Sequence, residues 1–203
     1  MTTRTEPRTG KVLWHFMMSL DGFIAAPGQD ALGWLEGVSI RPGVVAEYAD
    51  RIGAVLGGRK GWDAYPDSSA PYGGAMGGPT FILTHHPEDA KADQAGSGPG
   101  VTFLNCEVAE ATRIALKAAG GKDLVVFSAD IGRQLLEQGL LDELHLHIAP
   151  ILLGDGTRLF DNPAGVPIQL ERLTGDNLRA SVDVTYRPVR PNEANPQRAT
   201  DRE

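Results

Sequence analysis

The 203-residue sequence has little cysteine and no long hydrophobic segment. Its single cysteine, Cys106, cannot form an intramolecular disulfide, which excludes a disulfide-stapled secreted scaffold and is typical of a reducing compartment. No apolar run approaches the roughly 20 residues of a membrane-spanning helix, and the first residues, MTTRTEPRTG, lack the apolar segment of a signal peptide. We therefore expect a cytoplasmic protein without a membrane partner.

Positive charge is also scarce. Nineteen Lys and Arg stand against 26 Asp and Glu, a net charge of −7, so counterion release cannot drive general binding to nucleic acid. We expect no nucleic-acid partner. Glycine, in contrast, is abundant, with 25 residues against a usual share of about 7%. Without a collagen-like period or low complexity, these glycines predict turns, or places where the backbone approaches a ligand closely.

The two ends of the chain are poor in apolar side chains. Residues 1–10 and 190–203 contain no large apolar residue except Met1, so we expect both segments to be disordered tails. The remaining residues, 11–189, match the usual size of one domain.

Within that domain, apolar segments with strand character alternate with segments of helical periodicity. The expected strands are 11–18, 54–57, 80–84, 101–104, 123–127 and 142–150, and the expected helices are 42–52, 107–119 and 131–138. Residues 168–173 and 177–187 predict a closing hairpin, whereas 19–34, 68–78 and 87–100 predict loops. Strands interleaved with helices indicate an α/β fold with a mostly parallel sheet and an antiparallel C-terminal edge.

One possible ligand site follows the expected strand 54–57, where Gly57 and Gly58 precede two cations, Arg59 and Lys60. Backbone N–H groups at a helix start favour an anion, and an arginine offers a planar fork for phosphate. The pattern is neither the P-loop nor the Rossmann glycine motif. A surface turn with solvated cations is the alternative interpretation.

Two further strand exits carry polar or glycine residues. Residues 127–133 (FSADIGR) form a strand-to-helix junction at which Ser128 or Asp130 would either cap the helix or contact a ligand. Residues 151–156 (ILLGDG) form another exit, for which a plain turn is the alternative. Because ligands of open α/β sheets bind beyond the carboxyl ends of strands, several such junctions together favour a ligand site.

Asp21, directly after the first strand, is the candidate for proton chemistry; the alternative is a turn aspartate that bonds to nearby backbone. His145 and His147 share one face of the strand 142–150, but no third ligand follows at metal-site spacing, so we expect no metal. Cys106 has no basic neighbour in sequence, and no G-x-S-x-G elbow occurs.

Four segments occur in an order that resembles the dihydrofolate-reductase-like family, typified by the reductase domain of bifunctional riboflavin-biosynthesis enzymes. They are residues 18–25 (MSLDGFIA), 55–62 (VLGGRKGW), 81–84 (FILT) and one long block that runs from 134–144 (QLLEQGLLDEL) through 148–156 (IAPILLGDG). The resemblance covers about residues 11–187. It implies a three-layer fold with helices on both faces of a mixed, mostly parallel sheet, and an NADPH-dependent reductase that is a homodimer.

The resemblance also implies roles for individual residues. Arg59 and Lys60 would meet the cofactor phosphates, and Thr84 and His85 the adenosine and its ribose phosphate. Asp21 would lie near the nicotinamide and act in catalysis, with Ser19 and Trp34 at the substrate pocket. The other implied cofactor contacts are Gly57, Gly58, Ser128, Ala129, Asp130, Ile131 and Gly154.

The expected substrate is a small, planar, nitrogen-rich heterocycle such as a pterin or an aminopyrimidine, or a related C=N or C=O compound. Ser128 and Ala129 stand where the family usually has two glycines, which would let the backbone approach the pyrophosphate. A second hypothesis follows from this difference: a non-catalytic ligand-binding or stress-associated protein that keeps the fold and has lost the dinucleotide.

Overall fold

The computed structural model describes residues 10–28, 33–39, 42–64, 78–87, 100–163, 165–170 and 173. The chain divides into two compact units, Met1–Asp161 and Asn162–Glu203. All described helices and strands lie in the first unit. The expected single domain over residues 11–189 stays a prediction.

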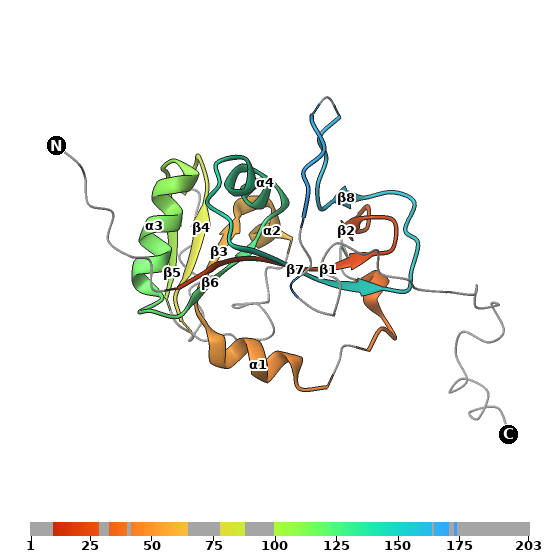
Figure 1. The fold of residues 1–203 in the computed structure, drawn as a ribbon, viewed down its shortest axis with the longest axis horizontal. Helices are drawn as coiled ribbons and strands as arrows, with labels where there is room; N and C mark the ends of the chain where they lie inside the picture. Colours follow the sequence, from red (N-terminus) through yellow and green to blue (C-terminus); the bar gives the residue numbers. More distant parts are fainter. Residues whose placement is uncertain are drawn as a thin grey trace, which may run out of the picture. The chain divides into compact units, whose positions relative to one another are not determined.

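A six-stranded sheet forms the centre of the first unit (Figure 1), with the strand order β5-β4-β3-β6-β1-β7. Every neighbouring pair in this sheet is parallel. A small antiparallel sheet joins β2 (Phe23–Ala25) to β8 (Thr157–Arg158). The central strands are β1 (Val12–Ser19), β3 (Ile52–Gly58), β4 (Thr80–Leu83), β5 (Val101–Leu104), β6 (Asp123–Phe127) and β7 (Glu143–Ala149).

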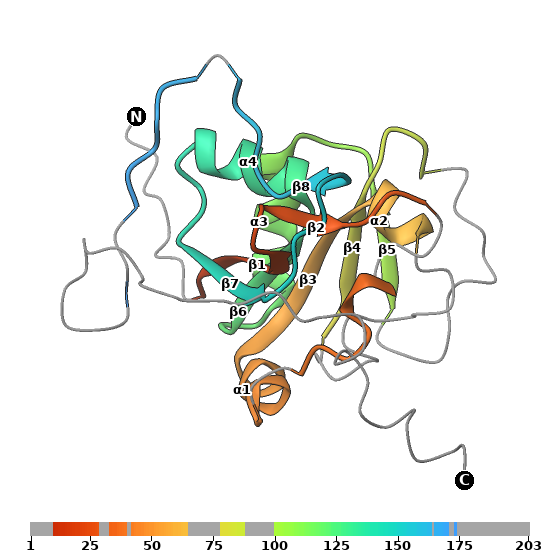
Figure 2. The ribbon, with the colours of Figure 1, turned by 90° about the vertical axis from the view of Figure 1, so that its right-hand side faces the viewer.

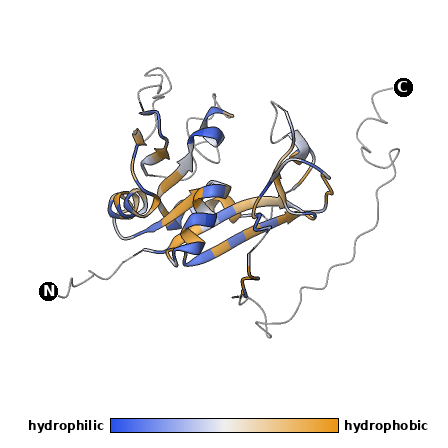
Figure 3. Cartoon of the chain, turned by 90° about the horizontal axis from the view of Figure 1, so that it is seen from above, coloured by the Kyte–Doolittle hydropathy of each residue, from blue (hydrophilic) through white to orange (hydrophobic). Residues whose placement is uncertain are grey.

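Helices cover both faces of the central sheet, which confirms the expected three-layer α/β fold. The side chains of Val12 and Trp14 pack with α3 (Val108–Ala118) and α4 (Ala129–Glu137) in one core cluster. The intervening Leu13 packs on the other face with Val125 and α1 (Val44–Arg51). This alternation follows from the two-residue period of a strand. Figure 3 shows the hydrophobic residues concentrated in these strands.

The helix ends follow the expected local signals. Gly120 (φ 62°) lies just beyond α3 and Gly139 (φ 67°) just beyond α4, in the left-handed conformation that favours glycine at a helix end. At the start of α4, the N–H of Ile131 donates to Ser128 Oγ at 3.3 Å. The capping interpretation of Ser128 is therefore confirmed.

Several boundaries differ from the expectation. The sequence predicts a helix that continues to Ile52, but Ile52 is the first residue of β3. In the strand its side chain is buried between the sheet and α1, which stabilises the extended conformation. The expected loop 19–34 contains β2 and the 3₁₀ turn η1 (Gly33–Leu35). Residues 168–170 form no strand. The rest of the expected closing hairpin, most of the loops 68–78 and 87–100, and almost all of both tails lie outside the described residues.

No helix in the part of the chain that the structure describes has the length and apolarity that crossing a membrane requires. Helix α2 (Arg59–Asp63) is the shortest of the α-helices and directly follows β3. Figure 2 shows β3 running from the end of α1 to the start of α2.

Helix α4 reaches the sheet through a glycine. A Cβ atom at Gly132 would overlap the indole ring of Trp14, a fully buried side chain of β1. The helix backbone therefore rests directly on the indole, which leaves no room for even a methyl group. This contact fixes the position of α4 and of the residues at its N-terminus.

We predict that Gly132→Ala destabilises the protein by about 1–3 kcal/mol, the usual effect of overfilling a packed core. Helix propensity alone predicts the opposite sign, a gain of about 0.5–1 kcal/mol for replacing an interior glycine. Urea unfolding of the wild type and the variant measures the difference. A variant more stable than the wild type would contradict the contact with Trp14.

Candidate functional site

The carboxyl ends of β3 and β6 lie side by side at a change of chain direction. Gly57 of β3 pairs with Phe127 of β6. From β3 the chain continues through α2 to β4, whereas from β6 it continues through α4 to β7, on the opposite side of the strand order. Ligands of open α/β sheets bind at such a topological switch point, just beyond the carboxyl ends of the strands.

The two strand exits at this point nearly touch. A Cβ atom at Gly58 would lie 3.1 Å from Ser128 Oγ, closer than an unstrained contact. The structure therefore brings together two junctions that lie about 70 residues apart in sequence. The sequence analysis expected glycines at places where the backbone approaches another group closely. At Gly58 the backbone approaches Ser128, the N-cap residue of α4.

The charged groups at the switch point suit an anionic ligand. Arg59 and Lys60 open α2, and the first turn of α4 directs its N–H groups to the same edge of the sheet. Arg59 Nε donates to the carboxylate of Asp63 at 2.7 Å and its guanidinium lies 5.7 Å from the centre of the Phe103 ring. Arg59 thus extends toward β5. The residues present fit the phosphates of a dinucleotide.

Asp130, a predicted cofactor contact, is directed along its own helix. It accepts hydrogen bonds from Arg133 at 2.8 Å and from Gln134 at 2.7 Å. The hydrogen bond from Arg133 is the largest cause of the lowered pKa of the Asp130 carboxyl. Asp130 is therefore an anion already paired within α4, and its contact with a cofactor stays a prediction.

Thr84 and His85 follow β4 at the same edge of the sheet. The Thr84 N–H donates to the Leu104 carbonyl at 2.9 Å, and its Oγ1 accepts from the His86 N–H at 3.1 Å. Because Gly58 pairs with Leu83, these two residues lie just beyond the exit of β3. The structure places them in line with Arg59, on the β5 side of the switch point.

The Asp21 carboxylate anchors the loop that follows β7. It accepts from the Ser19 hydroxyl at 2.7 Å, the Leu153 N–H at 3.0 Å and the Gly154 N–H at 2.7 Å. These bonds, led by that from Ser19, lower the pKa of Asp21 to about 2. Asp21 is thus an ionised acceptor at neutral pH. The interpretation of Asp21 as a turn residue did not include its hydrogen bonds with Leu153 and Gly154, which lie more than 130 positions away in the sequence. Its catalytic role stays a prediction.

Three other predicted site residues are Gly154, Ser19 and Trp34. The amide of Gly154 is engaged by Asp21, so a cofactor would meet only the other backbone atoms of this glycine, and the predicted contact is untested. Ser19 is buried, and its Oγ accepts from the Phe23 N–H at 2.9 Å. Trp34 is half-buried in η1, and its place at a substrate pocket stays a prediction.

An aromatic cluster on the α1 face of the sheet was missed by the sequence analysis. His15 of β1 is 0% exposed and stacks on Tyr48 of α1, with ring centroids 4.2 Å apart and planes 18° apart. Its ring lies 4.9 Å from His147 and 5.8 Å from Phe127. A histidine inside an otherwise apolar strand was the available signal.

The strand registers place this cluster beside the switch point. Trp14 pairs with Val126, so the next residue, His15, is level with Phe127, the last residue of β6. β1 and β7 continue four residues further, to Ser19 and Ala149. The two longer strands therefore form a wall beyond the exits of β3 and β6.

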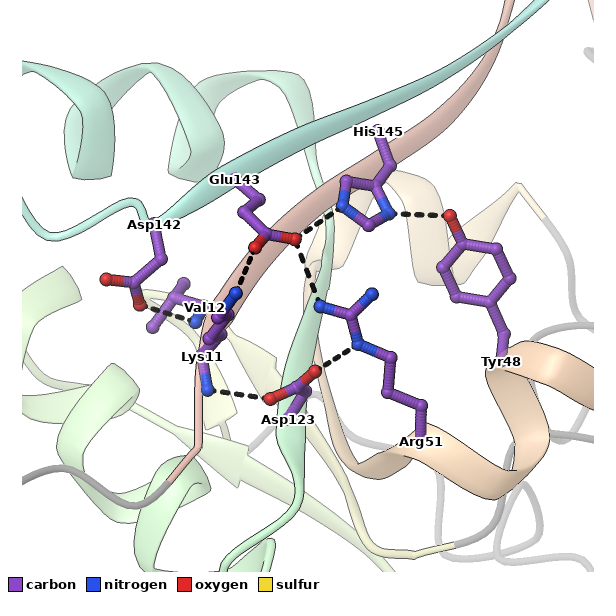
Figure 4. A network of polar contacts seen from close by, with 8 residues as sticks. All are labelled: Lys11, Val12, Tyr48, Arg51, Asp123, Asp142, Glu143 and His145. Atoms are coloured by element: carbon purple, nitrogen blue, oxygen red, sulfur yellow. Dashed lines mark hydrogen bonds and ion pairs between the residues drawn. The ribbon is translucent and has the colours of Figure 1, made fainter. Parts of the chain in front are cut away.

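The cluster continues into a polar network centred on Glu143 (Figure 4). His145 Nδ1 lies 2.6 Å from the Tyr48 hydroxyl, and His145 Nε2 lies 2.7 Å from Glu143. Glu143 also pairs with Lys11 and, at 3.0 Å, with Arg51, which in turn pairs with Asp123. Burial raises the pKa of Glu143, but the hydrogen bonds from Lys11, His145 and Arg51 outweigh it and hold the pKa at about 2.

Both ring nitrogens of His145 therefore have partners, which does not suit a metal ligand. Among the residues that the structure describes, no group of three or more His, Cys, Asp or Glu side chains is arranged to hold a metal ion.

A family model supplies the identification. The model of the RibD C-terminal domain matches residues 75–177, about half of the chain. The chain belongs to the RibD C-terminal domain family. It is a riboflavin-pathway reductase-like protein, and the family indicates an oxidoreductase. The resemblance stated from the sequence is confirmed.

Solved structures resemble this RibD C-terminal domain protein. A candidate riboflavin biosynthesis protein from Shewanella sp. PV-4 shares 26% identity at a TM-score of 0.60, over 77% of this chain and 86% of that one. The riboflavin biosynthesis reductase of Saccharomyces cerevisiae shares 16% identity at a TM-score of 0.53, over 86% and 89%.

A third structure is the diaminohydroxyphosphoribosylaminopyrimidine deaminase/5-amino-6-(5-phosphoribosylamino)uracil reductase of Thermotoga maritima. It shares 14% identity at a TM-score of 0.56, over 83% of this chain and 54% of that one. At such identities the last two structures show the fold alone. No curated protein matches the sequence significantly.

The buried histidine makes this RibD C-terminal domain protein acid-sensitive. Burial, then the charges of His147 and His145, lower the pKa of His15 from 6.5 to about 3. Below about pH 6.5 His15 binds a proton in the unfolded state, whereas in the folded state it stays neutral down to about pH 3. The free energy of unfolding therefore decreases as the pH falls toward 3. At pH 5 this loss is about 2 kcal/mol.

We predict that His15→Leu, which replaces the imidazole with an apolar side chain of similar size, removes this loss of stability at low pH. Urea unfolding at pH 7 and pH 5 should show a smaller decrease for the variant than for the wild type, by about 2 kcal/mol. Equal decreases would show that His15 is not held neutral in the folded protein.

Proposed function

We propose that the protein is an NADPH-dependent reductase that transfers hydride to a small planar heterocycle, such as a pterin or an aminopyrimidine, or to a related C=N or C=O compound. One observation carries the proposal: the two glycine- and serine-bearing exits of β3 and β6 meet at the switch point of a parallel sheet. Membership of the RibD C-terminal domain family supports the reductase.

Three groups of residues would hold the cofactor. Arg59 and Lys60 would neutralise phosphate, and the N-terminal turn of α4, from Ser128 to Ile131, would face the pyrophosphate. Thr84 and His85 would line the adenosine on the β5 side. A bound nicotinamide cofactor supplies the hydride, and the protein contributes position and charge.

On the β1 side, Asp21 would orient the substrate rather than protonate it. The carboxylate is held by hydrogen bonds from Ser19, Leu153 and Gly154, so its place is fixed. Its negative charge suits an N–H of a nitrogen-rich heterocycle. Asp21 would therefore act through its charge and its fixed place at the exit of β1.

The family match does not favour the alternative of a ligand-binding protein without the dinucleotide. We extend the proposal to a cytoplasmic homodimer. The exposed apolar side chains at the end of β7, Ile148 (51% exposed) and Leu152 (71% exposed), support a partner surface there.

We predict that NADPH quenches tryptophan fluorescence and raises the melting temperature, and that Arg59→Ala weakens NADPH binding by a factor of about 10 to 100. Losing a charge-assisted hydrogen bond to phosphate removes about 1.5–3 kcal/mol. NADH, which lacks the ribose phosphate, should lose less.

Arg113→Ala is the matched control, because it also removes an arginine that pairs with a carboxylate of its own helix, Glu110 on the exposed face of α3. No response of the wild type to millimolar NADPH would refute the proposed function. Equal losses of NADPH and NADH in Arg59→Ala would remove its role at the ribose phosphate.

We predict that Asp21→Asn lowers turnover while NADPH affinity stays within about twofold. The amide would turn an N–H donor toward the Leu153 or Gly154 N–H, which disturbs the loop at the substrate side and leaves the switch point intact. NADPH oxidation with dihydropterins, aminopyrimidines and small imines or ketones measures turnover. A loss confined to NADPH affinity would place Asp21 at the cofactor instead.

A further inference from the structure

We propose that Tyr48 is the proton donor of this reductase and that His145, fixed by Glu143, returns the proton to Tyr48. The proposal rests on the proposed function, because reduction of C=N or C=O needs a proton as well as a hydride. It names a group other than Asp21, whose carboxylate is ionised and accepts hydrogen bonds at neutral pH.

The first step is the direction of the hydrogen bonds. Glu143 is held as a carboxylate by Lys11 and Arg51, so it only accepts. His145 Nε2 must therefore carry the proton shared with Glu143. In a neutral imidazole the other nitrogen is an acceptor, so Nδ1 takes the hydrogen bond from the Tyr48 hydroxyl.

The second step is what a proton on His145 changes. A charged imidazole donates from both nitrogens, so Nδ1–H then donates to the Tyr48 oxygen. The phenolic hydrogen is released from His145 and can be donated to another acceptor. The direction of the Tyr48 hydroxyl thus depends on the charge of His145.

The third step is position. Tyr48 is 7% exposed, and its ring is fixed by the stack on His15. His15 is level with Phe127, which immediately precedes Ser128 at the switch point. Two ring contacts, Tyr48 with His15 and His15 with Phe127, therefore link the tyrosine to the residue that precedes Ser128. Its partner His145 is 20% exposed, so water can restore its proton.

The reaction consumes one hydride and one solvent proton, and it starts from the charged form of His145. When the substrate carbon takes the hydride, the π electron pair of the C=N or C=O bond moves to the nitrogen or oxygen, which takes the phenolic proton of Tyr48. The Tyr48 oxygen takes the Nδ1 proton of the charged His145, and the neutral His145 then takes up one proton from solvent, which restores the starting form. Glu143 keeps its hydrogen bond to Nε2 throughout and acts as a positioning residue.

Charged and titratable groups face this relay from each described element around it. They are His15 on β1, Tyr48 and Arg51 on α1, Asp123 on β6, Glu143 and His147 on β7, and Lys11 just before β1. Two cations and two carboxylates thus surround the Tyr48–His145 pair, and the experiments cover pH 5 to 8, the range in which histidine side chains generally change their charge.

The first experiment needs no substrate. In protein carrying ¹³C at the tyrosine ζ and histidine ε1 carbons, we expect the Tyr48 and His145 signals to titrate together, with one midpoint. The spectra of Tyr48→Phe and His145→Gln identify the two signals. In His145→Gln the Tyr48 signal should stop changing between pH 5 and 8. Separate midpoints, or a Tyr48 signal that still titrates in this variant, would overturn the relay.

The second experiment is the pH profile of kcat/KM, with NADPH and the substrate panel extended by 5-amino-6-(5-phosphoribosylamino)uracil, the compound named for the Thermotoga reductase. We expect Tyr48→Phe, which keeps the ring stack, to lower kcat by about 10²-fold or more. His145→Gln should remove the fall in rate toward high pH. Arg113→Gln, which changes a surface pair on α3, is the control and should match the wild type.

NADPH binding by fluorescence separates this proposal from the proposed function. Tyr48→Phe should bind NADPH within about twofold of the wild type. If NADPH binds and Tyr48→Phe keeps the wild-type rate and pH profile, Tyr48 is not the proton donor while the reductase stands. If the wild type does not bind NADPH, the proposed function fails, and the catalytic role of Tyr48 fails with it.

Discussion

The position of β6 between β3 and β1 is the constraint on which the rest of the structure depends. Because β6 separates two strands that come earlier in the chain, the connections after β3 and β6 must leave in opposite directions. The gap between those connections is the candidate site. The close contact of Gly58 with Ser128 shows how little space the two exits leave. A Cβ atom at Gly58 would press on Ser128 Oγ, which caps α4, and Gly132 of the same helix rests on the indole of Trp14, so the site and the core share one helix.

The opposite end of the sheet is held by charge rather than by packing. Arg51 ties α1 to β6 and β7 through Asp123 and Glu143, and Lys11 ties the start of β1 to β7. α1 also packs on the sheet through the buried side chains of Val44 and Tyr48, and the Tyr48 hydroxyl adds a hydrogen bond with His145. The charged end of the sheet thereby sets the geometry of the histidine cluster that lies beside the switch point.

The sequence predicted the strands, the helix ends at Gly120 and Gly139 and the Ser128 cap, because each depends on local periodicity or on a single φ angle. It predicted the strand exits as site candidates because parallel strands end at one edge. It could not predict the partners of Asp21, since Leu153 and Gly154 approach it only through the pairing of β1 with β7. Tyr48 and His15 were missed for the same reason: α1 and β1 each look like ordinary core elements until the fold stacks them.

Ser128 and Ala129 stand where the family usually has two glycines, and the surroundings of Ser128 show what this exchange changes. Its hydroxyl is committed to the Ile131 N–H, and it nearly touches Gly58. The Ser128 side chain therefore occupies the space beside Gly58 that a glycine at position 128 would leave open, and a Cβ atom at Gly57 would lie 3.3 Å from Ile82 Cδ1. The first N–H groups of α4 still lie at this edge of the sheet, and such groups favour an anion. The exchange of glycine for serine thus narrows the junction between β3 and α4 and leaves the N-terminal amides of α4 in place.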